Sequence, residues 1–154
     1  MVSVWLSSFH NMHFPSLGII RVIGAKAYGG DINLTQDGKQ IIDWGTVYPG
    51  TPTNRSFYIK SESNTPITLI LLDITRENIT FQNSNGENIT ETPPIEKPMN
   101  LTCNFNNTIL EPKEEIYATL TLTPSSNSDF LKFLIENDVE RFDFDIIIIA
   151  SEPS

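Results

Sequence analysis

The sequence predicts an all-β fold, a sandwich of two sheets with an extended N-terminal β-arm, and three observations lead to this prediction. Asn, Ser and Thr are abundant while charged residues make up only 19% of the 154 residues, a composition that favours strands and turns. Short stretches rich in Ile, Leu and Val recur and are separated by clusters of Pro, Gly and Asn. Helical periodicity is confined to one short stretch.

Length and charge narrow the classes of protein that the chain can belong to. A chain of 154 residues fits one domain with one core. The formal net charge of −9 argues against binding to nucleic acid, which needs clustered Lys and Arg, and against docking on anionic lipid. The sequence contains no apolar run of roughly 18 residues, so we expect no membrane span.

The chain opens with MVSVWLSSF, an apolar stretch without charge. Its apolar residues alternate over two faces, as in a strand that is covered on both sides. Pro15 is expected to end this extended stretch, because proline cannot donate to a strand ladder. We therefore expect a tail over residues 1–16 and a sandwich domain over residues 17–154. The apolar residues of the tail are Val2, Val4, Trp5, Leu6 and Phe9.

Three strands are expected in the first half of the domain. LGIIRVIGAKAY, residues 17–28, predicts one long strand that ends at the turn Gly29-Gly30-Asp31. IIDWG, residues 41–45, predicts a short strand, and SFYIK, residues 56–60, predicts another after a Pro/Gly turn. Trp44 is expected in the core, because burial of so large a ring supplies much of the stability of a sandwich.

The middle of the chain predicts a core strand followed by a long loop. SNTPITLILLDI, residues 63–74, combines a turn at Pro66 with an Ile/Leu run of strand length. Residues 83–98 are polar and contain three prolines, which predicts a surface loop. Residues 99–105 and 108–110 are weaker strand candidates.

The last third predicts two strands around one helix. In IYATLTLTP, residues 116–124, alternate residues are apolar, so Ile116, Ala118, Leu120 and Leu122 should face the core. Residues 129–140 predict a helix with Ser128 or Asp129 as N-cap. RFDFDIIIIAS, residues 141–151, predicts a final strand in the middle of a sheet. Seven to nine short strands with one short helix describe an immunoglobulin-like β-sandwich.

The sequence contains no recognisable catalytic constellation, so we expect no enzyme, no metal and no cofactor. His10 and His13 lie three residues apart in the expected arm and lack a third ligand. Cys103 has no neighbouring base to activate it and is read as a small apolar strand residue. Asp143 and Asp145 share one strand face, but the spacing of a calcium loop is missing, so a solvated face explains them.

Six acceptor sequons for N-linked glycans occur, more than the composition predicts by chance. They either match a short pattern by accident in an Asn/Thr-rich chain or mark an exported glycoprotein, and we favour the second interpretation. The lone Cys103 allows no internal disulfide and does not indicate a compartment. The sequon asparagines are Asn33, Asn54, Asn78, Asn88, Asn100 and Asn106.

Two segments carry a resemblance to a known family. The series IDWGT, PG and NTPITL within residues 41–71, with LEPKEEIYATLTLTPS and RFDFDIIIIA within residues 110–150, resembles the Ig-like domains of exported archaeal surface proteins. These segments make up about half of the chain. The long loop over residues 83–98 and the helix candidate depart from the simplest form of that domain.

Among these proteins, the whole chain is similar to the subunits of archaeal thread filaments. The resemblance implies a structural subunit of an extracellular, glycosylated cell-surface filament, a homopolymer of identical subunits. It also implies donor-strand complementation, in which the N-terminal tail of one subunit completes the sandwich of the next. The alternative function is a monomeric Ig-like adhesion module that binds carbohydrate or protein.

Three interpretations of the apolar start stay open. It could be the remnant of a signal peptide, although no positive region precedes it and Arg21 interrupts the apolar run before the A-x-A-like residues 25–27. It could pair within its own sandwich. It could instead be a strand lent to a neighbour, and such head-to-tail contacts propagate as a filament.

The third interpretation assigns roles to particular residues. Residues 1 to about 14 would form the donor strand, and Pro15–Gly18 would form a hinge. The acceptor groove would be lined by apolar residues of the Ile/Leu-rich stretches. The donor residues would be Val2, Val4, Trp5, Leu6 and Phe9. The acceptor residues would be Leu69, Leu71, Ile146 and Ile148.

Overall fold

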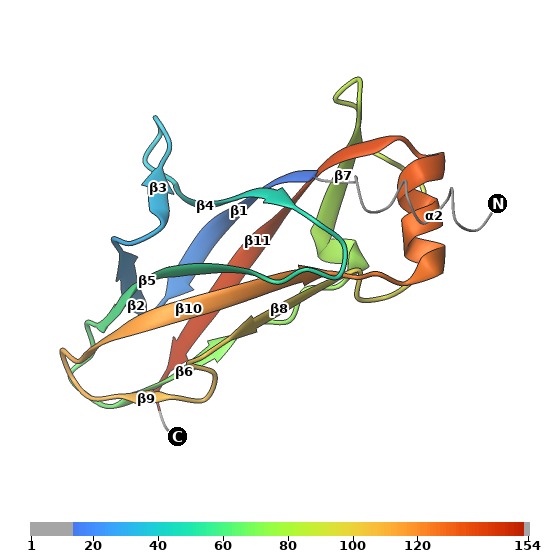
Figure 1. The fold of residues 1–154 in the computed structure, drawn as a ribbon. Coiled ribbons are helices and arrows are strands. Elements are labelled where there is room, and N and C mark those ends of the chain that lie inside the picture. Colours follow the sequence, from blue (N-terminus) through green and yellow to red (C-terminus); the bar gives the residue numbers. More distant parts are fainter. Residues whose placement is uncertain (1–13, 153–154) are drawn as a thin grey trace.

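The computed structural model describes residues 14–152, which form an immunoglobulin-like β-sandwich of two packed sheets with one helix across one end (Figure 1). The larger sheet has the strand order β3-β4-β1-β11-β6-β9, with β7 also paired to β11, and the smaller sheet has the order β2-β5-β10-β8. The predicted all-β sandwich is therefore confirmed.

The strands of the larger sheet are β1 (Phe14–Ile23), β3 (Ile32–Leu34), β4 (Gln40–Val47), β6 (Ile67–Leu71), β7 (Ile79–Asn83), β9 (Ile109–Leu110) and β11 (Val139–Ser151). Those of the smaller sheet are β2 (Ala25–Tyr28), β5 (Thr53–Ser61), β8 (Met99–Cys103) and β10 (Glu115–Pro124). The helical elements are η1 (Arg76–Asn78) and α2 (Ser128–Glu136).

The core lies between the two sheets and is built from alternate residues of each strand. In β10, Ala118, Leu120 and Leu122 are fully buried, as the alternation of residues 116–124 predicts. Trp44, expected in the core, has no exposed surface and lies against Phe144 of β11 with ring centroids 6.4 Å apart. Its ring therefore packs against another strand of the same sheet within the core.

The stretch from Leu17 to Tyr28 is two strands rather than the one that was predicted. β1 ends at Ile23 in the larger sheet, and β2 begins at Ala25 in the smaller sheet. Gly24 makes the crossing with φ +90°, and a Cβ there would lie 2.6 Å from the carbonyl oxygen of Ala150. Only glycine fits this bend, because it tolerates positive φ and lacks the Cβ that would clash.

The predictions that Pro15 ends the extended stretch and that Pro15–Gly18 form a hinge are wrong. Residues 14–16, which the sequence assigned to the tail, belong to β1, and Pro15 pairs with Thr46 of β4. Proline is tolerated near the start of a strand. Gly18 is held on both sides, with Ile42 and Phe144 as partners, so it provides close packing rather than a hinge.

Two short strands, and the loop after the second of them, also differ from the expectation. Neither β3 nor β7 was predicted. Within the expected surface loop of residues 83–98, Pro93 and Pro98 are buried. The Arg76 guanidinium donates a hydrogen bond to the Pro93 carbonyl at 3.1 Å, which ties the loop to η1.

The helix α2 is shorter than predicted. Asn127 is the N-cap, because its side chain accepts a hydrogen bond from the Phe130 N–H at 3.1 Å, and Asp138 adopts φ 54° just beyond the helix. Val139 and Glu140, predicted as helical, begin β11. Phe130 and Phe133 pack on Phe81 of β7, so α2 closes one end of the core.

Candidate assembly site

The first strand occupies a slot in the middle of the larger sheet. β1 lies between β4, to which it is antiparallel, and β11, to which it is parallel (Figure 1). The β1–β11 pair alone is parallel among the strand pairs of residues 14–152. Ile20 and Val22 lie beside Ile146 and Ile148, and these four residues point toward the core.

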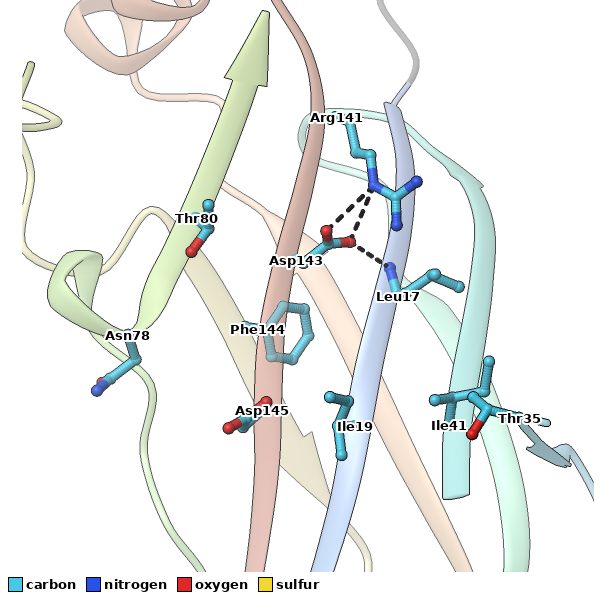
Figure 2. A pocket seen from close by; sticks show the side chains of 10 residues that line it. All are labelled: Leu17, Ile19, Thr35, Ile41, Asn78, Thr80, Arg141, Asp143, Phe144 and Asp145. Carbon is cyan, nitrogen blue, oxygen red and sulfur yellow. Dashed lines mark hydrogen bonds and ion pairs between the residues drawn. The ribbon is translucent and has the colours of Figure 1, made fainter. Parts of the chain in front are cut away.

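Close packing and one side chain fix β1 in this slot. A Cβ on Gly18 would lie 2.8 Å from Ile146 Cδ1, so β1 approaches β11 closely there. The Leu17 N–H donates to Asp143 Oδ1 at 3.2 Å, and the Arg141 Nε–H donates to Asp143 Oδ2 at 3.1 Å (Figure 2). The Asp143 carboxylate thus connects β11 to the start of β1.

A second ion pair crosses between the same two strands. Arg21 Nη2 of β1 lies 3.4 Å from Asp145 Oδ2 of β11, with the side chains 62% and 43% exposed. Pairs this exposed contribute little, because solvent screens them. The expectation of a solvated face for Asp143 and Asp145 holds for Asp145, whereas Asp143 also has a structural bond.

The predicted acceptor residues lie where the chain's own strands cover them, and their role toward a second chain stays a prediction. Leu69, Ile146 and Ile148 have no exposed surface, and Leu71 is half-buried. Both edges of β11 are occupied at this level, by β1 on one side and by β6 on the other. The strand that fills the slot is the chain's own β1.

The structure does not describe the predicted donor residues. Val2, Val4, Trp5, Leu6 and Phe9 lie outside the described residues, as do His10 and His13.

A groove lies on the outer face of the larger sheet, alongside β1 and β11 (Figure 2). Its volume is about 410 Å³, and a smaller hollow of about 260 Å³ shares Asn78 and Asp145 with it. Leu17, Ile19 and Ile41 supply apolar surface in the groove. Its polar lining is Thr35, Asn78, Thr80, Arg141, Asp143 and Asp145.

Two observations on residues 14–152 concern metal binding and nucleophilic attack. No group of three or more His, Cys, Asp or Glu side chains within residues 14–152 is placed to hold a metal ion. Burial raises the pKa of the Cys103 thiol, which disfavours the thiolate and hence nucleophilic attack. No helix in this part of the chain is long and apolar enough to cross a membrane.

The six sequon asparagines are all exposed to solvent. Asn54 and Asn100 lie on β5 and β8 of the smaller sheet, and Asn33 lies on β3 of the larger one. Three lie in η1 or in loops, namely Asn78, Asn88 and Asn106. Glycosylation requires such exposure, so none of the six positions conflicts with it.

Sequence reasoning missed the residues that hold β1 in place. Gly24 stands between IIRVI and AKAY and was the available sign of a break, but it was read as part of one strand. No local pattern indicates that Asp143 binds Leu17, because the two residues are 126 positions apart.

Comparison with known proteins leaves the family of the chain open. No protein-family model and no curated protein matches it. Among solved structures it is similar to the ASH / PapD-like domain of human CEP192 (PapD-like domain 7), with 8% sequence identity, 85% of each chain covered and a TM-score of 0.39.

Proposed function

We propose that this protein is a structural subunit of an extracellular cell-surface filament whose subunits exchange their first strand. The observation that carries the proposal is the position of β1. This strand fills the middle of the larger sheet. Its covalent connection to the rest of the described chain is the single residue Gly24, between β1 and β2. A strand so placed can leave its own sandwich and enter another.

The energetics of exchange follow from the strand's contacts. If β1 left the slot, β4 and β11 would expose unpaired backbone groups, and core residues such as Ile146 would face water. β1 of a second copy would restore the same hydrogen bonds and the same burial. Exchange therefore replaces each contact with an identical one, and association is governed by protein concentration and by the bend at Gly24.

Polymerisation follows if donor and acceptor differ at each joint. A subunit that gives β1 to one neighbour and receives it from another makes head-to-tail contacts, and such contacts form an open filament. Residues 1–13, whose apolar pattern suggests a strand, would lengthen the exchanged segment. The resemblance to archaeal thread subunits and the exposed sequons support a glycosylated surface filament.

A cysteine pair tests the exchange directly. Ile19 and Ile41 are partners on the outer face of β1 and β4. The variant Ile19→Cys/Ile41→Cys, made with Cys103→Ser, should form filaments that give a ladder of disulfide-linked subunits on a non-reducing gel. The control Lys60→Cys/Glu115→Cys joins β5 to β10, which stay in one subunit, and should give only a monomer band.

Two outcomes would contradict the proposal. If filaments form but their Ile19→Cys/Ile41→Cys subunits run as monomers on the non-reducing gel, β1 remains in the sandwich of its own subunit. Particles of monomer mass at every protein concentration would exclude the filament.

The second candidate is a monomeric Ig-like module for adhesion or for binding carbohydrate or protein. The observation that favours it is the completeness of the fold, since β1 already fills the slot and leaves a groove of about 410 Å³ on the outer face. Monomeric protein that binds a surface polysaccharide through this groove would support this candidate. Thr80→Trp, which would narrow the groove, should then abolish binding.

A further inference from the structure

A row of three tyrosines crosses the outer face of the smaller sheet. Tyr28 of β2, Tyr58 of β5 and Tyr117 of β10 are partners on adjacent strands, with ring centroids 5.6 Å and 5.0 Å apart. Tyr58 is 37% exposed and Tyr117 is 55% exposed. Such ring area facing water indicates a contact surface.

The sequon asparagine Asn54 lies on the same strand and face as this row. Residues 54, 56 and 58 of β5 alternate with the buried Phe57 and Ile59, so all three side chains point outward. The four residue steps from Asn54 to Tyr58 correspond to about 13 Å along the strand. A short oligosaccharide can span that distance.

Hydroxyl groups lie between Asn54 and the row. Ser56 Oγ and Thr119 Oγ1 are 2.9 Å apart, directly beside Tyr58 and Tyr117 in their strands. Thr121 Oγ1 donates to Asn54 Oδ1 at 2.8 Å. That bond uses the amide oxygen, so it leaves Nδ2, the atom that accepts a glycan, available.

We infer that the glycan N-linked to Asn54 lies along this face and rests on the tyrosine row. A pyranose has an apolar C–H face and a hydroxyl edge. The tyrosine rings suit the first, while the Ser56 and Thr119 hydroxyls and the Lys60 ammonium suit the second. The inference rests on the proposed function, because it requires an exported glycoprotein.

The attachment step has a defined balance. A lipid-linked oligosaccharyl pyrophosphate supplies the sugar, and a bond forms between Asn54 Nδ2 and the sugar C1. The bond from C1 to the pyrophosphate oxygen breaks, the lipid pyrophosphate leaves with its electron pair, and Nδ2 releases one proton to solvent.

A double-mutant cycle measures the contact between the glycan and the row. Thermal unfolding is compared for the wild type, Asn54→Gln, Tyr58→Ala and the double variant, each secreted from a glycosylating host and each made unglycosylated in bacteria. In glycosylated protein, Asn54→Gln should lower Tm by about 2 °C or more beyond its effect in the Tyr58→Ala background, where only the loss of the Asn54 side chain and of general glycan stabilisation remains. In unglycosylated protein, Asn54→Gln should have the same small effect with or without Tyr58.

The matched control is Asn88→Gln, which removes a sequon far from the row along the chain. Its effect on Tm should be independent of Tyr58 in both preparations. This separates a glycan that rests on the tyrosines from the general stabilisation that glycans bring.

Three results would overturn the inference. The effects of Asn54→Gln and Tyr58→Ala on Tm could be additive in the glycosylated protein, or mass spectrometry could find Asn54 unmodified in native material. The third is self-association of unglycosylated protein that Tyr58→Ala abolishes, which would make the tyrosine row a protein contact. Filaments with unmodified Asn54 would overturn this inference alone, whereas coupled effects in a monomeric glycoprotein would overturn the filament alone.

Discussion

The backbone N–H of Leu17 donates a hydrogen bond to Asp143 Oδ1 at 3.2 Å, so a side chain of the last strand holds the start of the first. The register of β1 against β4 shifts between Ser16 and Leu17. At this irregularity the carboxylate receives an N–H near the start of β1. The bond therefore compensates for an irregular pairing at the point where β1 enters the sheet.

Replacement of Asp143 should loosen this end of β1. Asp143→Ala removes the acceptor for Leu17 and the partner of Arg141, and we expect the free energy of unfolding to fall by about 1–2 kcal/mol. Asp145→Ala breaks only the exposed pair with Arg21 and should cost less than about 0.5 kcal/mol. Urea unfolding of both variants gives the two values, and equal losses would contradict a special role for Asp143.

Gly24 and Gly38 allow the steric cost of the sheet crossing to be separated from the cost of positive φ. Both have positive φ, +90° and +84°, but a Cβ on Gly24 would lie 2.6 Å from the Ala150 oxygen, whereas nothing lies within 4 Å of a Cβ on Gly38. Gly38→Ala should therefore cost about 1 kcal/mol, and Gly24→Ala should cost at least twice as much. Similar denaturation midpoints would mean that the crossing relaxes without strain.

The sheet crossing also explains which parts of the fold could be predicted from the sequence. Residues 116–124 were placed well because their alternation with period two is a local signal that burial on one face produces. The break at Gly24 was missed because an apolar run reads alike on either side of it. Which sheet each half joins depends on contacts with β11 and β5, far along the chain.

The candidate site shows the same limit. That β11 would enter the middle of a sheet was visible in its apolar run. Ile146 and Ile148 were assigned to an acceptor groove, whereas both lie fully buried in the core. The pairing of β1 with the edge of β11 could not be predicted. The two strands are parallel, so no short turn connects them and no turn signal in the sequence marks them as partners. The short β3 and β7 were missed because three to five residues carry little periodicity.

Trp44 predicts an unusual pattern of substitution costs. Its indole Nε1 is buried without a hydrogen-bond partner. Trp44→Phe therefore loses ring volume but no hydrogen bond, and we expect it to cost about 1–1.5 kcal/mol. Trp44→Ala, which leaves a cavity, should cost about 3–5 kcal/mol. A Trp44→Phe cost as large as that of Trp44→Ala in chemical denaturation would show that the indole has a partner after all.

The thiol of Cys103 should respond to pH above the range of an ordinary cysteine. Burial raises its pKa above that of an exposed cysteine, so the thiolate forms at higher pH in the folded protein than in the unfolded chain. Alkylation by iodoacetamide should reach its half-maximal rate at higher pH in native protein than in urea. By linkage, the contribution of this thiol to stability is fully present below the unfolded pKa and is lost as pH rises through the folded pKa. Cys103→Ser should lack this dependence.

Deletion of residues 2–9 should separate folding from assembly. The described residues 14–152 already form a closed sandwich, because β1 begins at Phe14 and fills the slot between β4 and β11. The shortened chain is therefore expected to keep a cooperative unfolding transition and near-native circular dichroism. If residues 2–9 lengthen the exchanged strand, it should also form no filaments in negative-stain electron microscopy.

The control for this deletion replaces Val2, Val4, Trp5, Leu6 and Phe9 with serine, which keeps the length of the chain and removes its apolar surface. Loss of filaments in both variants would assign the joint to apolar burial, worth an upper bound of about 10 kcal/mol before ordering costs. Filaments that persist in both would exclude these residues from the donor strand. Since β1 carries its own core contacts in Ile20 and Val22, the exchange would then depend on β1 alone.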